Sequence, residues 1–156
     1  MTMLTRLAVE ADKPGINELR RQVKLLHAAG KPDVFTEGFP QELADYLNTF
    51  FLQENGEVVV TERDGEIVGF ACINYVERPA SIYRHALKYC EVEEIGVDER
   101  CRRQGVGRAL MAFIQARAGE KGFSRIDLNM WEFNENALKF YESMGFRTYR
   151  RYMELV

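Results

Sequence analysis

Two glycines, Gly105 and Gly107, stand at the end of a basic turn and open an amphipathic segment; the turn carries Arg102, Arg103 and Arg108. The first N–H groups of a helix have no partner within it and carry partial positive charge, so helix starts bind anions. Glycine lets a phosphate approach the main chain because no Cβ intervenes, and arginine adds matching charge. The sequence therefore predicts a site for a pyrophosphate or a 3′-phosphate at this turn.

Other kinds of glycine turn fit this segment less well. A nucleotide-hydrolysing P-loop requires Gly-Lys-Ser/Thr, whereas Gly107 is followed by Arg108 and Ala109. A Rossmann turn requires a third small residue where Leu110 stands, and it normally follows the first strand of its unit. A tight turn in which the glycines only permit chain reversal is the remaining alternative.

A second group of reactive side chains, Glu91, Glu93 and Glu94, lies in the strand-like run before the turn. Alternation along a strand places Glu91 and Glu93 on one face and Glu94 on the other. A carboxylate of this kind is able to accept a proton. Each of the three is equally typical of a solvated strand residue.

Two motifs in the same order resemble the GNAT superfamily of acetyltransferases. Residues 102–107, Arg-Arg-Gln-Gly-Val-Gly, are similar to its R/Q-x-x-G-x-G/A pyrophosphate loop, and residues 94–99 resemble its fourth strand and the exit from it. Residues 134–146 are similar to its N-x-x-A-x-x-x-Y-x-x-x-G-F signature, with Tyr141 at the tyrosine position. The resemblance covers nearly the whole chain, although the first third matches by pattern more than by residues.

The resemblance implies that acetyl-coenzyme A is the acyl donor and that its acetyl group passes directly to a primary amine of a small molecule or a protein. The implied cofactor contacts are Ile95, Val97, Arg102, Arg103, Gln104, Gly105, Val106, Gly107, Arg108 and Asn134. Main-chain groups of Ile95 and Val97 are expected to bind the pantetheine arm, beside a bulge that splays this strand from its parallel neighbour. No metal is expected.

The resemblance also implies the chemistry at the thioester. Tyr141 is expected to protonate the departing thiolate. The alternative is a core aromatic residue, because Leu138, Tyr141 and Met144 share a helical face. Glu93 is the preferred base, with the other two glutamates of the strand as rivals. A rival of another class, a non-catalytic acyl-coenzyme A sensor, would need the basic turn but neither the tyrosine nor the glutamates.

The acceptor is expected between the first two helices. His27, Asp33 and Phe35 are its candidate contacts, and Asp33 suits a cationic amine. A histidine that interacts with the last carbonyls of a helix is an equal alternative for His27. Trp131 and Phe133 are expected either to line this pocket or to pack in the core. Residues 77–86 form a loop that either borders the pocket or is solvated.

The elements that must position these residues follow a regular order. Expected strands span residues 3–9, 57–63, 66–75, about 87–97, 126–130 and 146–155, with helices from Asp12 to Gly30, from near Pro40, after Gly107, and over 134–144. Asp64-Gly65 is a hairpin turn. The order predicts an α/β fold, the GNAT acyl-CoA N-acyltransferase fold: a mixed, mostly antiparallel sheet with splayed parallel strands 4 and 5 and helices on both faces.

Composition is consistent with one domain over residues 1–156. The 156 residues are 46% hydrophobic and 29% charged, and the net charge of −3 lacks the basic footprint of a nucleic-acid-binding protein. No apolar run reaches membrane-spanning length, and three scattered cysteines, Cys72, Cys90 and Cys101, suggest neither disulfides nor zinc. A cytoplasmic location is expected, with no nucleic-acid or membrane partner, and the final strand would suit a homodimer.

Overall fold

A five-stranded sheet runs through the computed structural model, which describes residues 2–156. The strands are β1 (Met3–Leu7), β2 (Gly56–Arg63), β3 (Glu66–Arg78), β4 (Leu87–Val97) and β5 (Ile126–Leu128), in that spatial order. The first four pair antiparallel, and β4 pairs with β5 in parallel. The predicted mixed sheet with parallel fourth and fifth strands is confirmed.

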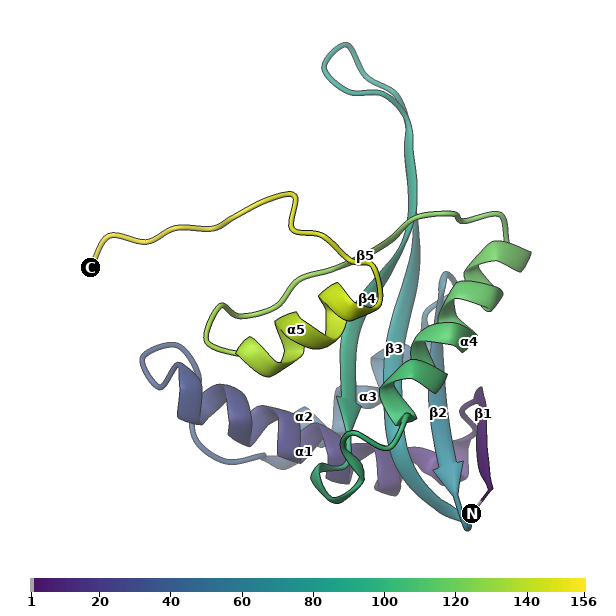
Figure 1. Ribbon diagram of the computed structural model, residues 1–156, viewed down its shortest axis with the longest axis vertical. Coiled ribbons are helices and arrows are strands. Elements are labelled where there is room, and N and C mark those ends of the chain that lie inside the picture. The colour runs from purple at the N-terminus through teal and green to yellow at the C-terminus, as the bar shows by residue number, and fades with distance from the viewer. Residues whose placement is uncertain (1) are drawn as a thin grey trace.

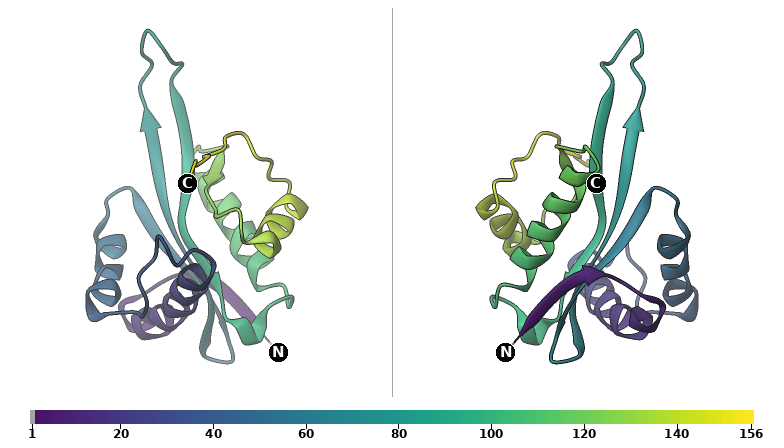
Figure 2. Two further views of the ribbon diagram at one scale, coloured as in Figure 1. Left: turned by 90° about the vertical axis from the view of Figure 1, so that its left-hand side faces the viewer. Right: turned by 90° about the vertical axis from the view of Figure 1, so that its right-hand side faces the viewer.

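Helices cover both faces of the sheet, as Figures 1 and 2 show. One face carries α1 (Lys13–Gly30), α2 (Gln41–Asp45) and α3 (Leu47–Leu52), and the other carries α4 (Val106–Glu120) and α5 (Glu135–Ser143). Two short 3₁₀ turns, η1 (Glu10–Asp12) and η2 (Glu99–Cys101), precede α1 and the loop before α4. The helix expected from near Pro40 is thus two short helices. None of the helices in residues 2–156 is long and apolar enough to cross a membrane.

The sheet separates two hydrophobic cores because successive strand side chains point to opposite faces. In β2, Val58 and Val60 pack with Ile16 of α1, whereas Val59 between them packs with Leu110 of α4. Full burial of a side chain of this size stabilises the fold by about 1.5–3 kcal/mol. The buried side chains of these helices recur at helical spacing: Ile16 and Leu19 in α1, and Leu110 and Ile114 in α4.

The turn between β2 and β3 is the predicted two-residue hairpin. Asp64 and Gly65 both have positive φ, 52° and 84°, as a type I′ turn requires. The next hairpin is longer than expected, because cross-strand pairs as far as Arg78 and Leu87 continue the ladder. The paired strands and the loop of residues 79–86 form an arm that projects beyond the helices (Figure 1).

The predicted final strand is wrong. Residues 146–156 form neither strand nor helix, and β5 is three residues long. The segment contacts the body through side chains: the Tyr149 hydroxyl donates to Asp127 (2.7 Å), and the Lys31 ammonium donates to Glu154 (2.5 Å). The sequence of residues 146–155 lacks the regular polar–apolar alternation of a half-buried strand: Arg147 and Thr148 are consecutive polar residues, as are Arg150 and Arg151. A homodimer through this segment stays a prediction.

The start of α1 and the end of α5 are stabilised in different ways. Asp12 precedes α1, as predicted, but its carboxylate accepts from the N–H of Val9 (2.7 Å) and from Arg6 (2.7 Å) rather than from the helix. At the end of α5, Gly145 has φ 98° and the N–H of Phe146 donates to the carbonyl of Tyr141 (3.0 Å). This Schellman arrangement explains the glycine in the second motif.

Gly145→Ala should lower the free energy of unfolding by about 1 kcal/mol, because an alanine at positive φ is strained. Gly119→Ala is the matched control: Gly119 lies in α4, and a Cβ there would meet nothing within 4 Å. The control should raise stability by about 0.5 kcal/mol, since alanine is the better helix former. Urea unfolding of both variants measures these changes. Equal stabilities would contradict the role of Gly145.

Candidate active site

β4 contains one extra residue, Glu93. The adjacent β3 residues Cys72 and Ile73 lie opposite Glu94 and Val92, so Glu93 has no residue opposite it. This is a β-bulge, which bends a strand and ends regular pairing. The parallel pairing with β5 also stops at Val92, and the chain after β5 turns away from β4 (Figure 1). The bulge expected beside the parallel neighbour is therefore present.

The end of β4 beyond the bulge has a free main-chain edge. The N–H of Asp98 donates to the carbonyl of Val68 (2.9 Å), which marks a hydrogen-bonded pair of the antiparallel ladder. Such pairs alternate along a ladder, so Ile95 and Val97 direct their N–H and C=O groups away from β3. On that side the pairing with β5 has already ended. These main-chain groups are disposed to bind an extended ligand.

The start of α4 leaves several N–H groups without helix partners. Arg103 and Gly105 have positive φ, 62° and 87°, and this geometry turns the chain into the helix. The N–H of Ala109 is the first to bond within the helix, to the carbonyl of Gly105 (3.0 Å), and no side chain caps the N-terminus. Among residues 2–156 the N–H groups of residues 105–108 have no hydrogen-bond partner and are thus available to an anion. The side chains of Arg102 and Arg103 are exposed beside them.

The rest of the turn is fixed by the protein itself. Arg63 on β2 donates to the side-chain oxygen of Gln104 and to the sulfur of Cys101 (2.8 Å). The amide of Gln104 donates to the carbonyl of Arg100 (3.3 Å). Gln104, a predicted cofactor contact, therefore has its side chain engaged within the turn, and its contribution to an anion would come from the main chain.

α5 packs directly on the start of α4. A Cβ on Gly107 would lie 2.9 Å from the ring of Phe140, so glycine is needed there for helix contact as well as for access to the main chain. Arg108 also reaches α5, and its guanidinium donates to the hydroxyl of Ser143 (3.4 Å). The same helix carries Tyr141, which is thereby placed close to the turn.

Tyr141 is 9% exposed and lies between Phe140 and Phe146, with ring centroids 5.3 and 5.6 Å away. Burial raises the pKa of its hydroxyl to about 12. Among residues 2–156 that hydroxyl has no hydrogen-bond partner, yet its oxygen is not sealed from solvent. Tyr141 thus packs in the core on the α4 face, but among the described residues its hydroxyl lacks the backbone partner that a purely structural role would favour. A phenol that stays protonated can act as a proton donor.

Asn134 occupies the N-cap of α5, where its side-chain oxygen accepts from the N–H of Ala137 (3.2 Å). Asn134 and Gly145 of the second motif therefore begin and end the helix that carries Tyr141. The side-chain amide nitrogen of Asn134 is left for the cofactor contact that the resemblance implies.

Glu94 lies on the α1 face of the sheet, where its carboxylate accepts from the guanidinium of Arg20 (2.8 Å). Glu91 and Glu93 lie close to it on the same face, since the charges of Glu91 and Glu94 both act on Glu93. The prediction that Glu94 points to the opposite face is wrong because the bulge inserts one residue and shifts the alternation. Three carboxylates therefore gather beside the bulge.

Glu93 has the electrostatic environment of a proton acceptor. Glu93 is exposed, but partial desolvation of its carboxyl beside the strand raises its pKa above the usual value, and the charges of Glu91 and Glu94 raise it further. The side-chain amides of Asn74 on β3 and Gln53 after α3 act in the opposite direction. A carboxylate whose pKa lies closer to neutrality is a better general base at physiological pH.

Three polar residues beside the carboxylates were not predicted from the sequence: Arg20, Gln53 and Asn74. Arg20 had a usable signal: it lies four residues after Ile16 and three before Val23, on the apolar stripe of α1, where an unpaired charge is costly. A buried carboxylate partner could have been expected from that spacing. Gln53 and Asn74 give no comparable sequence signal.

An aromatic cluster joins the end of α1 to the loop before α5. His27 stacks on Phe35 (centroids 5.2 Å apart) and meets Phe133 edge-on (6.2 Å), and Phe35 meets Trp131 edge-on (5.1 Å). A Cβ on Gly30 would lie only 2.1 Å from the ring of Phe133. The structure thus brings together His27, Phe35 and the two aromatic residues that the sequence placed either in the pocket or in the core.

Asp33 does not join this cluster. Its side chain is exposed and its carboxylate lies 3.6 Å from the ammonium of Lys31. The arm with residues 79–86 projects away from α1 (Figure 2), so the solvated alternative fits that loop. Burial raises the pKa of the Cys90 thiol to about 12 and that of Cys72 well above its usual value, as expected for unreactive core residues.

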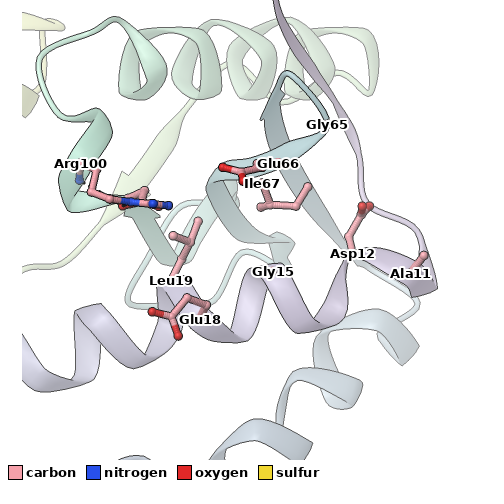
Figure 3. Close-up of a pocket in the computed structure, with 10 residues that line it drawn as sticks. Ala11, Asp12, Gly15, Glu18, Leu19, Gly65, Glu66, Ile67 and Arg100 are labelled. Atoms are coloured by element: carbon pink, nitrogen blue, oxygen red, sulfur yellow. Dashed lines mark hydrogen bonds and ion pairs between the residues drawn. The ribbon is translucent and has the colours of Figure 1, made fainter.

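A separate cavity of about 360 Å³ lies between the first half of α1, the β2–β3 turn and the exit of β4 (Figure 3). Its buried carboxylates are already paired, Asp12 with Arg6 (2.7 Å) and Asp98 with Arg100 (2.8 Å). None of the predicted catalytic, cofactor or acceptor residues lines it. In residues 2–156 no three His, Cys, Asp or Glu side chains are grouped as metal ligands would be.

Burial lowers the pKa of His27, so protonation should destabilise the fold. The unfolded chain binds the proton more tightly, and stability is therefore lost as the pH falls below the unfolded value of about 6.5. His27→Phe, which preserves an aromatic ring, should lack this loss, so the unfolding free energy of the wild type minus that of the variant should fall as the pH is lowered from about 8 to 5. His85→Phe, in the exposed arm, is the matched control and should keep the wild-type profile. An identical profile for His27→Phe would contradict the burial argument.

Comparisons with known proteins agree with this architecture. The chain is 33% identical over 129 residues to the 5-NmdU N-acetyltransferase of Pseudomonas phage PaMx11, with 82% of each chain covered. The BH1408 protein of Bacillus halodurans, solved as a tetramutant, superposes with a TM-score of 0.94 at 26% identity, covering 98% of this chain and 99% of that one.

Proteins of lower identity or coverage support narrower conclusions about the chain. AAC(6')-Iy in complex with the bisubstrate analogue CoA-S-monomethyl-acetylneamine has a TM-score of 0.78 at 18% identity, with 100% and 98% covered, which shows a common fold. The chain spans about half the length of two mammalian relatives: 45% of N-acetyltransferase family 8 member 2 of Rattus norvegicus and 55% of probable family 8 member 5 of Mus musculus, each 26% identical. The model of the Acetyltransferase (GNAT) family matches residues 23–146, and the chain belongs to that family.

Proposed function

We propose that the chain transfers the acetyl group of acetyl-coenzyme A directly to a primary amine of a small molecule or a protein. One observation carries this proposal: the free edge of β4 lies between the uncapped start of α4 and the bulge at Glu93. A ligand with an anionic end and an extended arm could follow this path, and its far end would arrive between Glu93 and Tyr141.

The residues present fit acetyl-coenzyme A. The N–H groups of residues 105–108, with the exposed guanidiniums of Arg102 and Arg103, suit a pyrophosphate. The main-chain groups of Ile95 and Val97 suit the amides of a pantetheine arm. When bound, the cofactor supplies an activated acetyl group as a thioester. The phosphate end would be held by charge and the arm by strand-like hydrogen bonds.

The proposed proton transfers use opposite faces of the sheet. On the α1 face, Glu93 takes the proton of the acceptor ammonium, directly or through water, and frees the nitrogen lone pair. The nitrogen then bonds to the acetyl carbon as the carbon–sulfur bond breaks, and main-chain N–H groups at the bulge stabilise charge on the carbonyl oxygen. The nitrogen loses its second proton to solvent as the amide forms, and on the α4 face Tyr141 gives its proton to the leaving sulfur and regains one from solvent.

The acceptor is proposed to be a cationic amine. The carboxylates beside the bulge, Glu91 and Glu93, attract positive charge, and the cluster of His27, Phe35 and Trp131 offers an apolar surface nearby on the acceptor side. The phage relative is named a 5-NmdU N-acetyltransferase, and AAC(6')-Iy was solved with the bisubstrate analogue CoA-S-monomethyl-acetylneamine. These names support a small-molecule amine over a protein.

Replacing both Arg102 and Arg103 with alanine should weaken coenzyme A binding by roughly tenfold or more, because charge-assisted contacts to phosphate are lost. Arg150→Ala with Arg151→Ala is the matched control, since it removes the same charge from the exposed tail. Titration calorimetry at fixed ionic strength compares the three proteins. Equal weakening in both double variants would mean that only net charge matters and would overturn this cofactor site.

Tyr141→Phe should lower kcat for thiol release from acetyl-coenzyme A by roughly a hundredfold or more, because the leaving sulfur loses its proton donor. The assay uses a panel containing an aminoglycoside, a polyamine, an amino acid and a protein amine. Coenzyme A affinity should persist, and Tyr83→Phe, in the exposed arm, should react as the wild type does. Full turnover in Tyr141→Phe would exclude the proposed donor. Tight binding without turnover for any amine would favour a sensor that binds acyl-coenzyme A.

A further inference from the structure

Arg20 is a buried cation in the middle of α1, with 6% of the residue exposed. Its guanidinium donates to both oxygens of Glu94 on β4 (2.8 and 3.5 Å) and to the side-chain oxygen of Asn17 (2.8 Å). It also donates to the main-chain carbonyl of Leu43 in α2 (2.7 Å), and the ring of Phe39 lies 5.6 Å away. One side chain therefore connects α1, α2 and the bulged strand.

This ion pair distinguishes among the three carboxylates beside the bulge. Burying a guanidinium is costly unless it is paired, so the position of Arg20 requires a carboxylate partner. Glu94 fills that role with both oxygens, and its negative charge is compensated. Among the described residues Glu91 and Glu93 form no such ion pair. Glu93 is the residue that the bulge adds, at the point where β4 and β5 separate.

The charged and polar groups around Glu93 come from four elements. β4 contributes Glu91 and Glu94, β3 contributes Asn74, and the residue after α3 is Gln53. From α1, Arg20 and His27 both interact with Glu94. Of these groups Arg20 is the one that carries a permanent positive charge. It therefore weakens the repulsion that Glu94 still exerts on an ionised Glu93.

We propose that Arg20 is a positioning residue for acetyl transfer: its guanidinium holds Glu94 against α1 and leaves Glu93 as the carboxylate that receives the proton of the acceptor amine. This inference rests on the proposed function, in which Glu93 is the base. It adds a division of labour between neighbouring glutamates that the motif itself does not specify. A purely structural tie between α1 and α2, through the carbonyl of Leu43, is the alternative.

The test measures the titration of Glu93 directly, by NMR of protein labelled with ¹³C at the glutamate carboxyl carbon, and needs no acceptor. Glu93→Gln assigns the signal. Arg20→Gln leaves the charge of Glu94 uncompensated and should raise the Glu93 midpoint by about one pH unit. Glu94→Gln removes the repulsion while Arg20 stays, and should lower the midpoint by a similar amount. Arg20→Lys keeps the charge and should stay close to the wild type.

Opposite shifts in Arg20→Gln and Glu94→Gln, with rescue by lysine, support the proposal. Midpoints unchanged within about 0.2 units, or shifts in the same direction, would overturn it in favour of the structural tie. If Arg20→Gln fails to fold, Glu94→Gln and Arg20→Lys still distinguish the positioning role from the structural tie. In Glu94→Gln the isosteric amide keeps the contact with the guanidinium of Arg20. Glu93→Gln separately tests the proposed function: full acetyl transfer by this variant would exclude Glu93 as the base, whatever the NMR midpoints show.

Discussion

A central strand that pairs fully on both sides has no main-chain groups left for a ligand, and β4 avoids this with one extra residue. Glu93 breaks the register with β3 and coincides with the end of the pairing with β5. Beyond it, Ile95 and Val97 keep their positions in the antiparallel ladder and leave their other edge free. The same extra residue turns Glu94 toward α1, where a buried arginine pairs with it. The free edge and the arrangement of carboxylates therefore have a common origin.

The two sequence motifs, residues 102–107 and 134–146, also pack against each other. Gly107 admits the ring of Phe140, so α5 lies against the first turn of α4, and Arg108 extends the contact to Ser143. Asn134 and Gly145 fix the two ends of α5 and thereby set the position of Tyr141. Substitution in either motif would move the other helix. The glycines and caps that look like ligand-binding signatures in sequence are also the residues that hold two helix surfaces in contact.

Much of the fold follows from local chemistry and could be predicted. Apolar periodicity located α1 and α4, and Asp64-Gly65 defined a hairpin whose turn angles only a few residue types adopt readily. The failures involve partners that lie far along the chain. A final strand needs a neighbouring edge, and residues 147–156 bond to the body through side chains such as Tyr149 and Glu154. The face of Glu94 depends on a bulge, and strand alternation cannot reveal where an extra residue enters.

The cofactor half and the acceptor half of the candidate site differ in how they are built. The turn at residues 102–108 is one continuous segment, so its residues alone predict an anion site. The acceptor side combines the end of α1, the loop after it and the approach to α5, where Phe133 packs into the space left by Gly30. Side chains from three segments meet there without a fixed spacing in sequence. An acceptor surface of this kind can change by single substitutions while the sheet and the α4 turn stay intact, which is why family membership leaves the amine undetermined.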